Sequence, residues 1–372
     1  MEFENRNTLV NLSNTLAKQF GLDPFHNTIP QIEKLVKGHK KVVVLLFDGM
    51  GTYIQDTHKD LMPFIYSHKA HQIDSTFPPT TVAATTAFLT GKYPIETGWM
   101  SLTQYLAQYK DNVDVFRNRY SFSHEVIREG KLVLEDICPK KDIKDLINLK
   151  RGQKVAFDMN DVYGTYHGPE NLTLSRWKLS RFIKNKEELY LYYYYEKLDT
   201  AIHTSGVYGK ETKKKIKGIE RFVKKITKKH PDTLFVVIAD HGLIDCKDID
   251  IVQFPDLLSC LSEVRPISFE PRCPTFWVKE DKKVEFEQLF KKHYGAHFDL
   301  FTKDEVLQKN IFGEGIISVT ALDFIGDYLA ISRDEYRLKD SRLVNKCYPP
   351  ASHGGGTKEE NDINVAIFNS KN

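Results

Sequence analysis

The sequence predicts an α/β protein with a doubly wound, mostly parallel sheet that has helices on both faces. Two apolar runs, residues 41–47 and 233–239, are rich in β-branched side chains and polar on neither face, as is typical of strands buried in a parallel sheet. Strands of this kind place functional residues in the crevice beyond their carboxyl ends. A lysine-rich segment between the two runs carries one apolar stripe, as expected of a helix that covers a sheet, at Ile216, Ile219, Val223 and Ile226.

The rest of the chain divides around this core. Leucines and a phenylalanine at three- and four-residue spacings predict a helical segment over residues 1–37. Residues 92–185 lack repeated strand signals and are interpreted as an insert near the active site. Residues 268–340 combine strand-like runs at 275–278 and 327–332 with a helix at 284–294, which predicts a small α+β insert or cap. The core itself is assigned to residues 38–91, 186–267 and 341–372.

Composition excludes several classes of protein. With 53 Lys+Arg against 50 Asp+Glu, the net charge of +3 over 372 residues gives no general reason to expect a nucleic acid polymer as partner. The 5 cysteines show no CxxC spacing, which argues against a disulfide framework or a thiolate zinc site. The apolar run 42–47 is far shorter than the ~20 residues that span a bilayer, so no membrane association is expected. Because Met1–Arg6 lacks the pattern of a signal peptide, we expect a cytoplasmic protein.

Two of the polar segments directly follow the predicted strands. Asp48 begins an Asp-Gly sequence after the first strand, where it can hold a cation or merely start a turn. Asp240 and His241 lie side by side after the second strand, and this pair is uncommon as packing because both side chains need partners when buried.

Three further segments carry candidate groups, each with a structural alternative. In residues 75–91, two prolines precede hydroxyl residues and alanines, so a hydroxyl begins a helix either as a nucleophile facing an anion or as an N-cap. Asp199 and His203, four residues apart, share one helix face and can bind a cation or hydrogen-bond to each other. The tyrosine-rich run 189–195 before them is interpreted as a half-buried strand. His353 is flanked by glycines, which suggests either close approach to a site or a flexible loop.

Taken together, three carboxylates and three imidazoles make two three-residue ligand sets. Mixed oxygen and nitrogen ligands suit Zn²⁺, or Mn²⁺ where carboxylates dominate. Two such cations ~4 Å apart can clamp the attacking and leaving oxygens of a displacement at phosphorus and activate a hydroxyl nucleophile. The sequence therefore predicts two divalent metal ions at one site.

The order and spacing of these segments resemble the alkaline phosphatase superfamily and, within it, the type I phosphodiesterase/nucleotide pyrophosphatase family. The resemblance implies an alkaline-phosphatase-like core and covers about residues 40–108, 190–250 and 345–368. The segments that carry it are FDGMG (47–51), STFPPTTVAATTAFLTGKYPIETGW (75–99), YEKLDTAIHTSG (195–206), VVIADHG (236–242) and SHGGG (352–356).

The resemblance also implies roles for individual residues. The family's nucleophile lies ten residues before the glycine of a Thr-Gly pair, and counting back from Gly91 selects Thr81. Family diesterases often carry an asparagine three residues after the nucleophile, where this chain has Ala84, so more of the transition-state charge is expected to fall on the metals and on backbone N–H groups. The implied ligands of one metal are Asp48, Thr81, Asp240 and His241, and those of the other are Asp199, His203 and His353.

These observations predict a phosphoric ester hydrolase that cleaves phosphodiester or nucleotide pyrophosphate bonds, with a small phosphate ester as its substrate. A phosphomonoesterase or phosphonate hydrolase that uses the same site is the first alternative. A non-catalytic nucleic-acid-binding protein that uses the lysines of residues 213–229 is a remote one. Tyr163, Tyr166 and His167 are polar-aromatic candidates for substrate contact.

Overall fold

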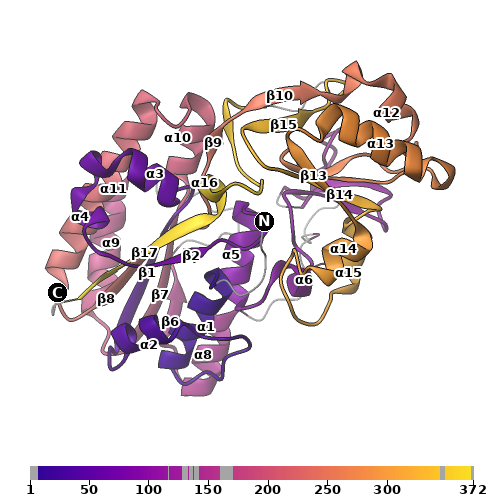
Figure 1. Ribbon diagram of the computed structural model, residues 1–372. Helices are drawn as coiled ribbons and strands as arrows, with labels where there is room; N and C mark the ends of the chain where they lie inside the picture. The colour runs from indigo at the N-terminus through magenta and orange to yellow at the C-terminus, as the bar shows by residue number, and fades with distance from the viewer. Residues whose placement is uncertain are drawn as a thin grey trace.

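The chain folds into a larger and a smaller lobe that lie side by side (Figure 1). This computed structural model describes residues 7–115, 117–127, 133, 137, 142–159, 171–343 and 348–369. Tyr163, Tyr166 and His167 lie outside the described residues. Within the described chain, no helix combines the length and the apolar character needed to cross a membrane.

A six-stranded mixed sheet forms the centre of the larger lobe. Its four neighbouring strands β8, β1, β7 and β6 run parallel, whereas β17 is antiparallel to both β8 and β2. This arrangement confirms the predicted α/β fold with a mostly parallel sheet. In spatial order the strands are β2 (Lys69–Asp74), β17 (Asp362–Phe368), β8 (Leu234–Ile238), β1 (Lys41–Phe47), β7 (Leu189–Tyr195) and β6 (Ala156–Asp158).

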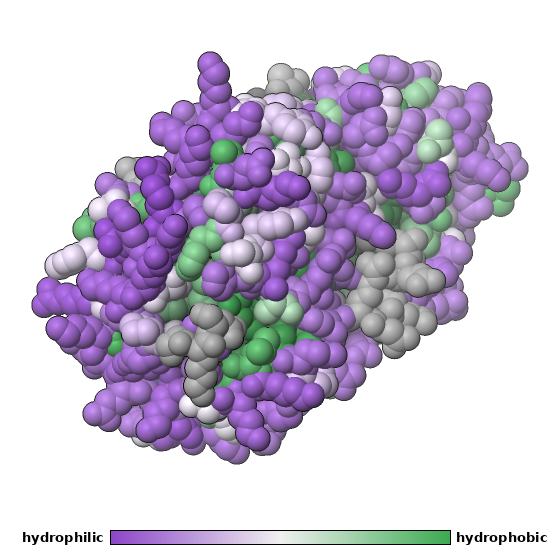
Figure 2. Space-filling model, turned by 60° about the vertical axis from the view of Figure 1, so that its left-hand side comes forward, coloured by the Kyte–Doolittle hydropathy of each residue, from purple (hydrophilic) through white to green (hydrophobic). Residues whose placement is uncertain are grey.

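Helices cover both faces of this sheet, as predicted (Figure 1). The apolar stripe of α11 is buried, so its lysines lie on the solvated side, and the surface seen in Figure 2 is largely hydrophilic. One group of helices in mutual contact is α4 (Pro63–Tyr66), α9 (Leu172–Lys184), α10 (Lys197–Ser205) and α11 (Lys210–Lys229). The other group is α1 (Leu9–Gln19), α2 (Pro30–Val36), α5 (Thr81–Thr90) and α8 (Ile143–Arg151), whereas α6 (Pro94–Thr97), which follows α5, lies beside the smaller lobe (Figure 1).

The tyrosine-rich strand β7 is fully buried, which corrects the predicted half-buried strand. It lies between β1 and β6, so helices cover both of its faces. Tyr192 stacks on Phe88 of α5 at 5.7 Å between ring centroids, and Tyr193 stacks on Phe222 of α11 at 5.5 Å. Successive side chains of a strand therefore reach opposite helix layers. The run of tyrosines could not predict complete burial, because phenol rings suit both buried and interfacial positions.

The smaller lobe has its own sheet and its own apolar cluster. The structure has strands near the two runs expected at 275–278 and 327–332, and a helix at the expected position 284–294. The four strands in order are β11 (Ser268–Glu270), β12 (Cys273–Phe276), β14 (Tyr328–Ser332) and β13 (Phe298–Thr302). The helices of this lobe are α12 (Pro255–Ser259), α13 (Lys283–Tyr294), α14 (Lys303–Gln308) and α15 (Val319–Phe324).

Three minor sheets and two short α-helices complete the described strands and α-helices. The strand β9, which follows the Asp-His pair, is antiparallel to β16, which precedes His353. The remaining strands are β3 (Thr103–Leu106), β4 (Asp111–Asp114), β5 (Arg119–Tyr120), β9 (Ile244–Asp245), β10 (Lys247–Asp250), β15 (Tyr336–Lys339) and β16 (Ala351–Ser352). The two helices are α3 (Thr52–Thr57) and α16 (Lys358–Asn361).

The structure places two boundaries differently from the prediction. Among the described parts of residues 92–185, α6 and β3–β5 lie beside the smaller lobe, where α6 contacts α15 and β3 contacts β11, whereas α8, β6 and α9 belong to the larger lobe. Residues 247–261, predicted as core, contribute β10 and α12 to the smaller lobe, and Ile251 and Leu257 belong to its apolar cluster. Both differences arise because β6 and β10 have only 3 and 4 residues. Strands this short show too little alternation of apolar and polar residues to be predicted from the sequence.

Candidate active site

The predicted polar residues meet at the carboxyl ends of the three central parallel strands. Asp48 directly follows β1, and Asp240 and His241 follow β8. Asp199 and His203 lie on α10, which begins two residues after β7 ends. The ends of adjacent parallel strands share one edge of a sheet, so these groups converge although they lie up to 193 positions apart in the chain, from Asp48 to His241.

Asp48, Asp240 and His241 form one buried cluster. A ligand atom from each lies within 4.8 Å of those of the other two. His241 Nε2 is 3.4 Å from Asp48 Oδ1 and 3.6 Å from Asp240 Oδ2. The other oxygen of Asp240 accepts hydrogen bonds from the backbone N–H groups of Gly49 and His241, at 3.1 and 3.0 Å. Backbone donors therefore fix the orientation of Asp240 and leave Oδ2 directed at the cluster.

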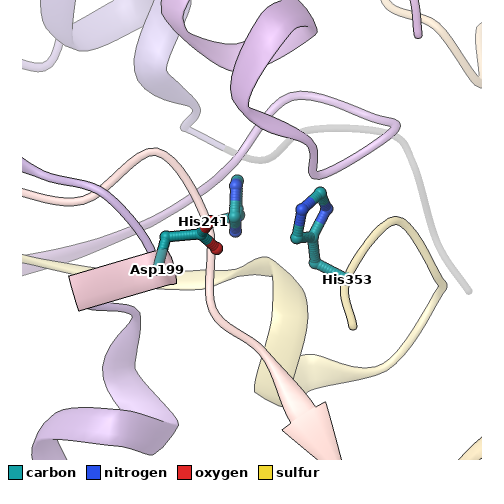
Figure 3. Close-up of side chains that lie close together, drawn as sticks. All are labelled: Asp199, His241 and His353. Carbon is teal, nitrogen blue, oxygen red and sulfur yellow. The ribbon is translucent and has the colours of Figure 1, made fainter. Parts of the chain in front are cut away.

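Asp199, His241 and His353 form a second cluster whose ligand atoms also lie within 4.8 Å of one another. Figure 3 shows His241 between Asp199 and His353, which approach it from α10 and from the loop after β16. His203 stands next to this cluster, because its Nε2 is 3.3 Å from Asp199 Oδ1. Its Nδ1 lies 2.8 Å from the carbonyl oxygen of Ala351, so the ring is held with Nε2 facing the site.

Thr81 is the first residue of α5 and faces the first cluster. Its Oγ1 is 3.1 Å from His241 Nε2 and 3.3 Å from Asp48 Oδ2. The preceding Thr80 does not cap the helix through its side chain. The first N–H groups of the helix are thus left for another acceptor, as at helix ends that bind anions. Ala84 is fully buried.

The electrostatics of the site favour a cation. Burial, together with the neighbouring charges of Asp240 and Asp199, raises the pKa of Asp48 well above its usual range. Burial also raises the pKa of Asp199. For His353, burial and the neighbouring imidazoles of His241 and His203 lower the pKa well below its usual value, so the ring is neutral and can act as a ligand.

The hydrogen bonds of the site fit the same conclusion. Asp199 Oδ1, Asp240 Oδ2 and His353 Nδ1 are buried and make no hydrogen bond within the described part of the chain. No lysine or arginine among the described residues forms an ion pair with Asp48, Asp199 or Asp240. Buried carboxylates without a counter-charge are costly, and a divalent cation would compensate them. The residues present therefore fit a metal site.

Tyr194 is a site residue that the sequence reasoning did not identify. Its hydroxyl donates a hydrogen bond to Asp48 Oδ2. Burial and the charge of Asp48 raise the pKa of the Tyr194 phenol well above its usual range, so the phenol keeps its proton and remains a donor. The alternation of side chains along a strand could have identified it. Tyr194 lies on the same face of the sheet as Tyr192, which packs on the helix that begins at Thr81.

Comparison with known proteins agrees with this geometry. Residues 42–356 match the family described as type I phosphodiesterase / nucleotide pyrophosphatase. Comparison with curated protein sequences gives no match.

Solved structures of ectonucleotide pyrophosphatase / phosphodiesterase 5 resemble the chain. The murine protein has a TM-score of 0.64 at 16% sequence identity, with 88% of each chain covered. The human protein has a TM-score of 0.65 at 14% identity, also with 88% of each chain covered. An inactive threonine-to-alanine variant of the murine protein, in complex with AMP, has a TM-score of 0.63 at 15% identity and covers 89% of this chain and 88% of its own.

At these identities the solved structures show a shared fold, while the family match spans most of the chain. The matched range contains every residue of the two clusters, together with Thr81. This chain therefore belongs to the type I phosphodiesterase / nucleotide pyrophosphatase family of the alkaline phosphatase superfamily, a family of metal-dependent phosphoric ester hydrolases.

Proposed function

We propose that this protein hydrolyses phosphodiester or nucleotide pyrophosphate bonds, with Thr81 as the nucleophile and two divalent metal ions at the two clusters. The observation that carries the proposal is the position of the Thr81 hydroxyl. It lies at the N-terminus of α5, 3.1 Å from His241 Nε2 and 3.3 Å from Asp48 Oδ2. A nucleophile there faces both the cation ligands and the free N–H groups that suit a phosphate.

The ligands divide between two sites. Asp48, Thr81, Asp240 and His241 would hold one metal ion, and Asp199, His203 and His353 the other, with His241 close to both. The cations would favour loss of the proton from a bound hydroxyl and offset the negative charge that develops at phosphorus. Zinc suits this set of carboxylate and imidazole ligands, and manganese is the alternative.

The chain's own groups would orient the reaction. Thr81 Oγ1 attacks phosphorus, a new O–P bond forms, and the bond from phosphorus to the leaving oxygen breaks. The backbone N–H groups of Val82 and Ala83, in the first turn of the helix, donate to the phosphoryl oxygens. Water then cleaves the phosphothreonine and restores the Thr81 hydroxyl.

A carboxylate from the smaller lobe favours diesters over monoesters. Glu270 Oε1 accepts hydrogen bonds from the hydroxyls of Thr80 and Ser101, at 3.4 and 3.0 Å, and from the backbone N–H of Leu102 at 3.2 Å. These donors hold the Glu270 carboxylate beside Thr80, the residue that precedes the nucleophile. A phosphate monoester carries up to two negative charges and a diester one, so repulsion from Glu270 disfavours the monoester more.

The murine relative's variant was solved with AMP, which supports small nucleotide substrates for this chain. A cytoplasmic location stays a prediction, and cell fractionation tests it.

The test of the mechanism is Thr81→Ala, assayed with p-nitrophenyl phosphodiesters on metal-loaded protein. We expect kcat to fall by about a thousandfold or more, because the attacking group is lost. Thr86→Ala is the matched control, since Thr86 lies on the same helix and its buried hydroxyl makes no hydrogen bond with described residues. Turnover by Thr81→Ala at the rate of the control would refute the assignment. Elemental analysis of the purified protein gives the metal and its stoichiometry.

A further inference from the structure

A fully buried ion pair joins the two lobes beside the candidate active site. Arg272, in the turn between β11 and β12, and Glu360, in α16, both have 0% exposure. Arg272 Nε donates to Glu360 Oε1 at 2.6 Å, and Nη2 donates to Oε2 at 2.7 Å. This is the two-pronged geometry in which a guanidinium fixes a carboxylate most strongly.

Glu360 contacts the two chain segments that carry His241 and His353. Its Oε1 accepts the backbone N–H of Gly355 at 2.8 Å, and its Oε2 accepts the hydroxyl of Thr357 at 2.6 Å. Its backbone carbonyl accepts the N–H of Gly242 at 2.8 Å. Gly355 lies two residues after His353, and Gly242 directly follows His241. Glu360 thus links the backbone segments of His241 and His353, the two imidazoles of the second cluster.

Arg272 is itself fixed by the smaller lobe. Its Nη1 donates to the carbonyl of Tyr336 at 2.9 Å, and its Nη2 donates to the carbonyl of Asp334 at 2.6 Å. Its own carbonyl accepts the N–H of Ser332 at 2.9 Å. The approach is too close for a side chain on the opposing loop, since a Cβ at Gly355 would lie 2.7 Å from Arg272 Nη2. The glycine therefore lets the guanidinium reach the loop of His353.

We infer that Arg272 and Glu360 are positioning residues that hold His353 and His241 in the geometry needed to bind metal. Stability alone is a weak explanation for this pair, because apolar residues of similar volume often replace a buried ion pair without loss. What apolar residues cannot supply is the charged acceptor for Gly355 and Thr357 that aligns the ligand loop. The inference rests on the proposed function only in that these imidazoles bind metal.

Glu360→Gln tests the inference, because it keeps the shape of the side chain and removes its charge. We expect one of the two zinc dissociation constants, measured by competition with a chromophoric chelator, to rise about 10- to 100-fold, as for other groups that orient metal ligands. The zinc concentration for half-maximal diesterase activity should rise in parallel, while KM for the diester at saturating zinc stays the same. Asp248→Asn is the matched control, since it breaks the ion pair with Arg337 in the smaller lobe, where Nε lies 2.7 Å from Oδ1.

Folding is controlled separately. If Glu360→Gln leaves Arg272 too costly to bury, the double variant Arg272→Met with Glu360→Gln restores a neutral interior, and the zinc measurement is made on it. Both zinc constants within twofold of the wild type in a folded variant, or a loss no larger than that of Asp248→Asn, would overturn the inference. That result would leave the proposed function standing. A wild-type protein that binds zinc but hydrolyses no diester would refute the proposed function and leave the zinc comparison valid.

Discussion

Replacing Tyr194 by phenylalanine tests the electrostatics of the site most directly. The hydroxyl of Tyr194 donates to Asp48 Oδ2, and this bond lowers the pKa of Asp48 against burial and neighbouring charge, which raise it. Without the hydroxyl, the pKa of Asp48 rises further. Since a carboxylate binds metal only when it is ionised, zinc affinity must fall.

The size of the effect follows from the bond that is lost. A buried hydrogen bond to a charged group contributes about 1.5–3 kcal/mol, and each ~1.4 kcal/mol is tenfold in a dissociation constant. We therefore expect zinc to bind Tyr194→Phe about 10- to 100-fold more weakly near pH 6. The deficit should shrink as the pH rises, because Asp48 becomes ionised in both proteins.

The assay is zinc competition with a chromophoric chelator between pH 6 and 8.5, followed by diester hydrolysis at each pH. Tyr193→Phe is the control, because it removes the same group from the opposite face of β7, where Tyr193 stacks on Phe222. A zinc affinity of Tyr194→Phe within twofold of the wild type at pH 6, or an equal loss in Tyr193→Phe, would refute the reasoning.

Three more changes have defined outcomes. Asp48→Asn should abolish zinc-dependent activity yet raise the Tm of the metal-free protein at pH 8. Burial and two neighbouring carboxylates raise the pKa of Asp48 in the folded state above its value in the unfolded state. As the pH rises from the unfolded-state pKa through the folded-state pKa, this carboxyl group therefore lowers the stability of the fold. An unchanged or lower Tm of Asp48→Asn would contradict this. Gly242→Ala should lower the Tm, with a loss of at least ~1–3 kcal/mol in unfolding free energy, because the new Cβ would lie 2.1 Å from the carbonyl oxygen of Glu359; wild-type thermal unfolding would show that the loop can move aside. Glu270→Gln should raise kcat/KM for a phosphate monoester relative to a diester at least about tenfold, since two unit charges ~10 Å apart repel by about 1.7 kcal/mol at an effective dielectric constant near 20, and ~1.4 kcal/mol is tenfold; an unchanged ratio would remove Glu270 from substrate selection.

Much of the candidate site could be read from the chain because its residues follow strong local signals. Asp48 and Asp240 come after strands whose apolar runs are unmistakable, and a parallel sheet brings such strand ends together. Asp199 and His203 share a helix face through their spacing alone. The division of the lobes was harder to predict, because strands as short as β6 and β10 have no period of their own and are defined by their partners.

The sequence by itself determined the fold class, the identity of the candidate nucleophile and the residue types that surround it, because these depend on local pattern and on motif order. Only the tertiary structure decided that His241 lies within ligand distance of both clusters. It also showed that Tyr194 donates to Asp48, and that Arg272 and Glu360 join the lobes behind His353. Those contacts join residues up to 193 positions apart along the chain, as for Asp48 and His241, and no local pattern encodes a partner that only packing brings close.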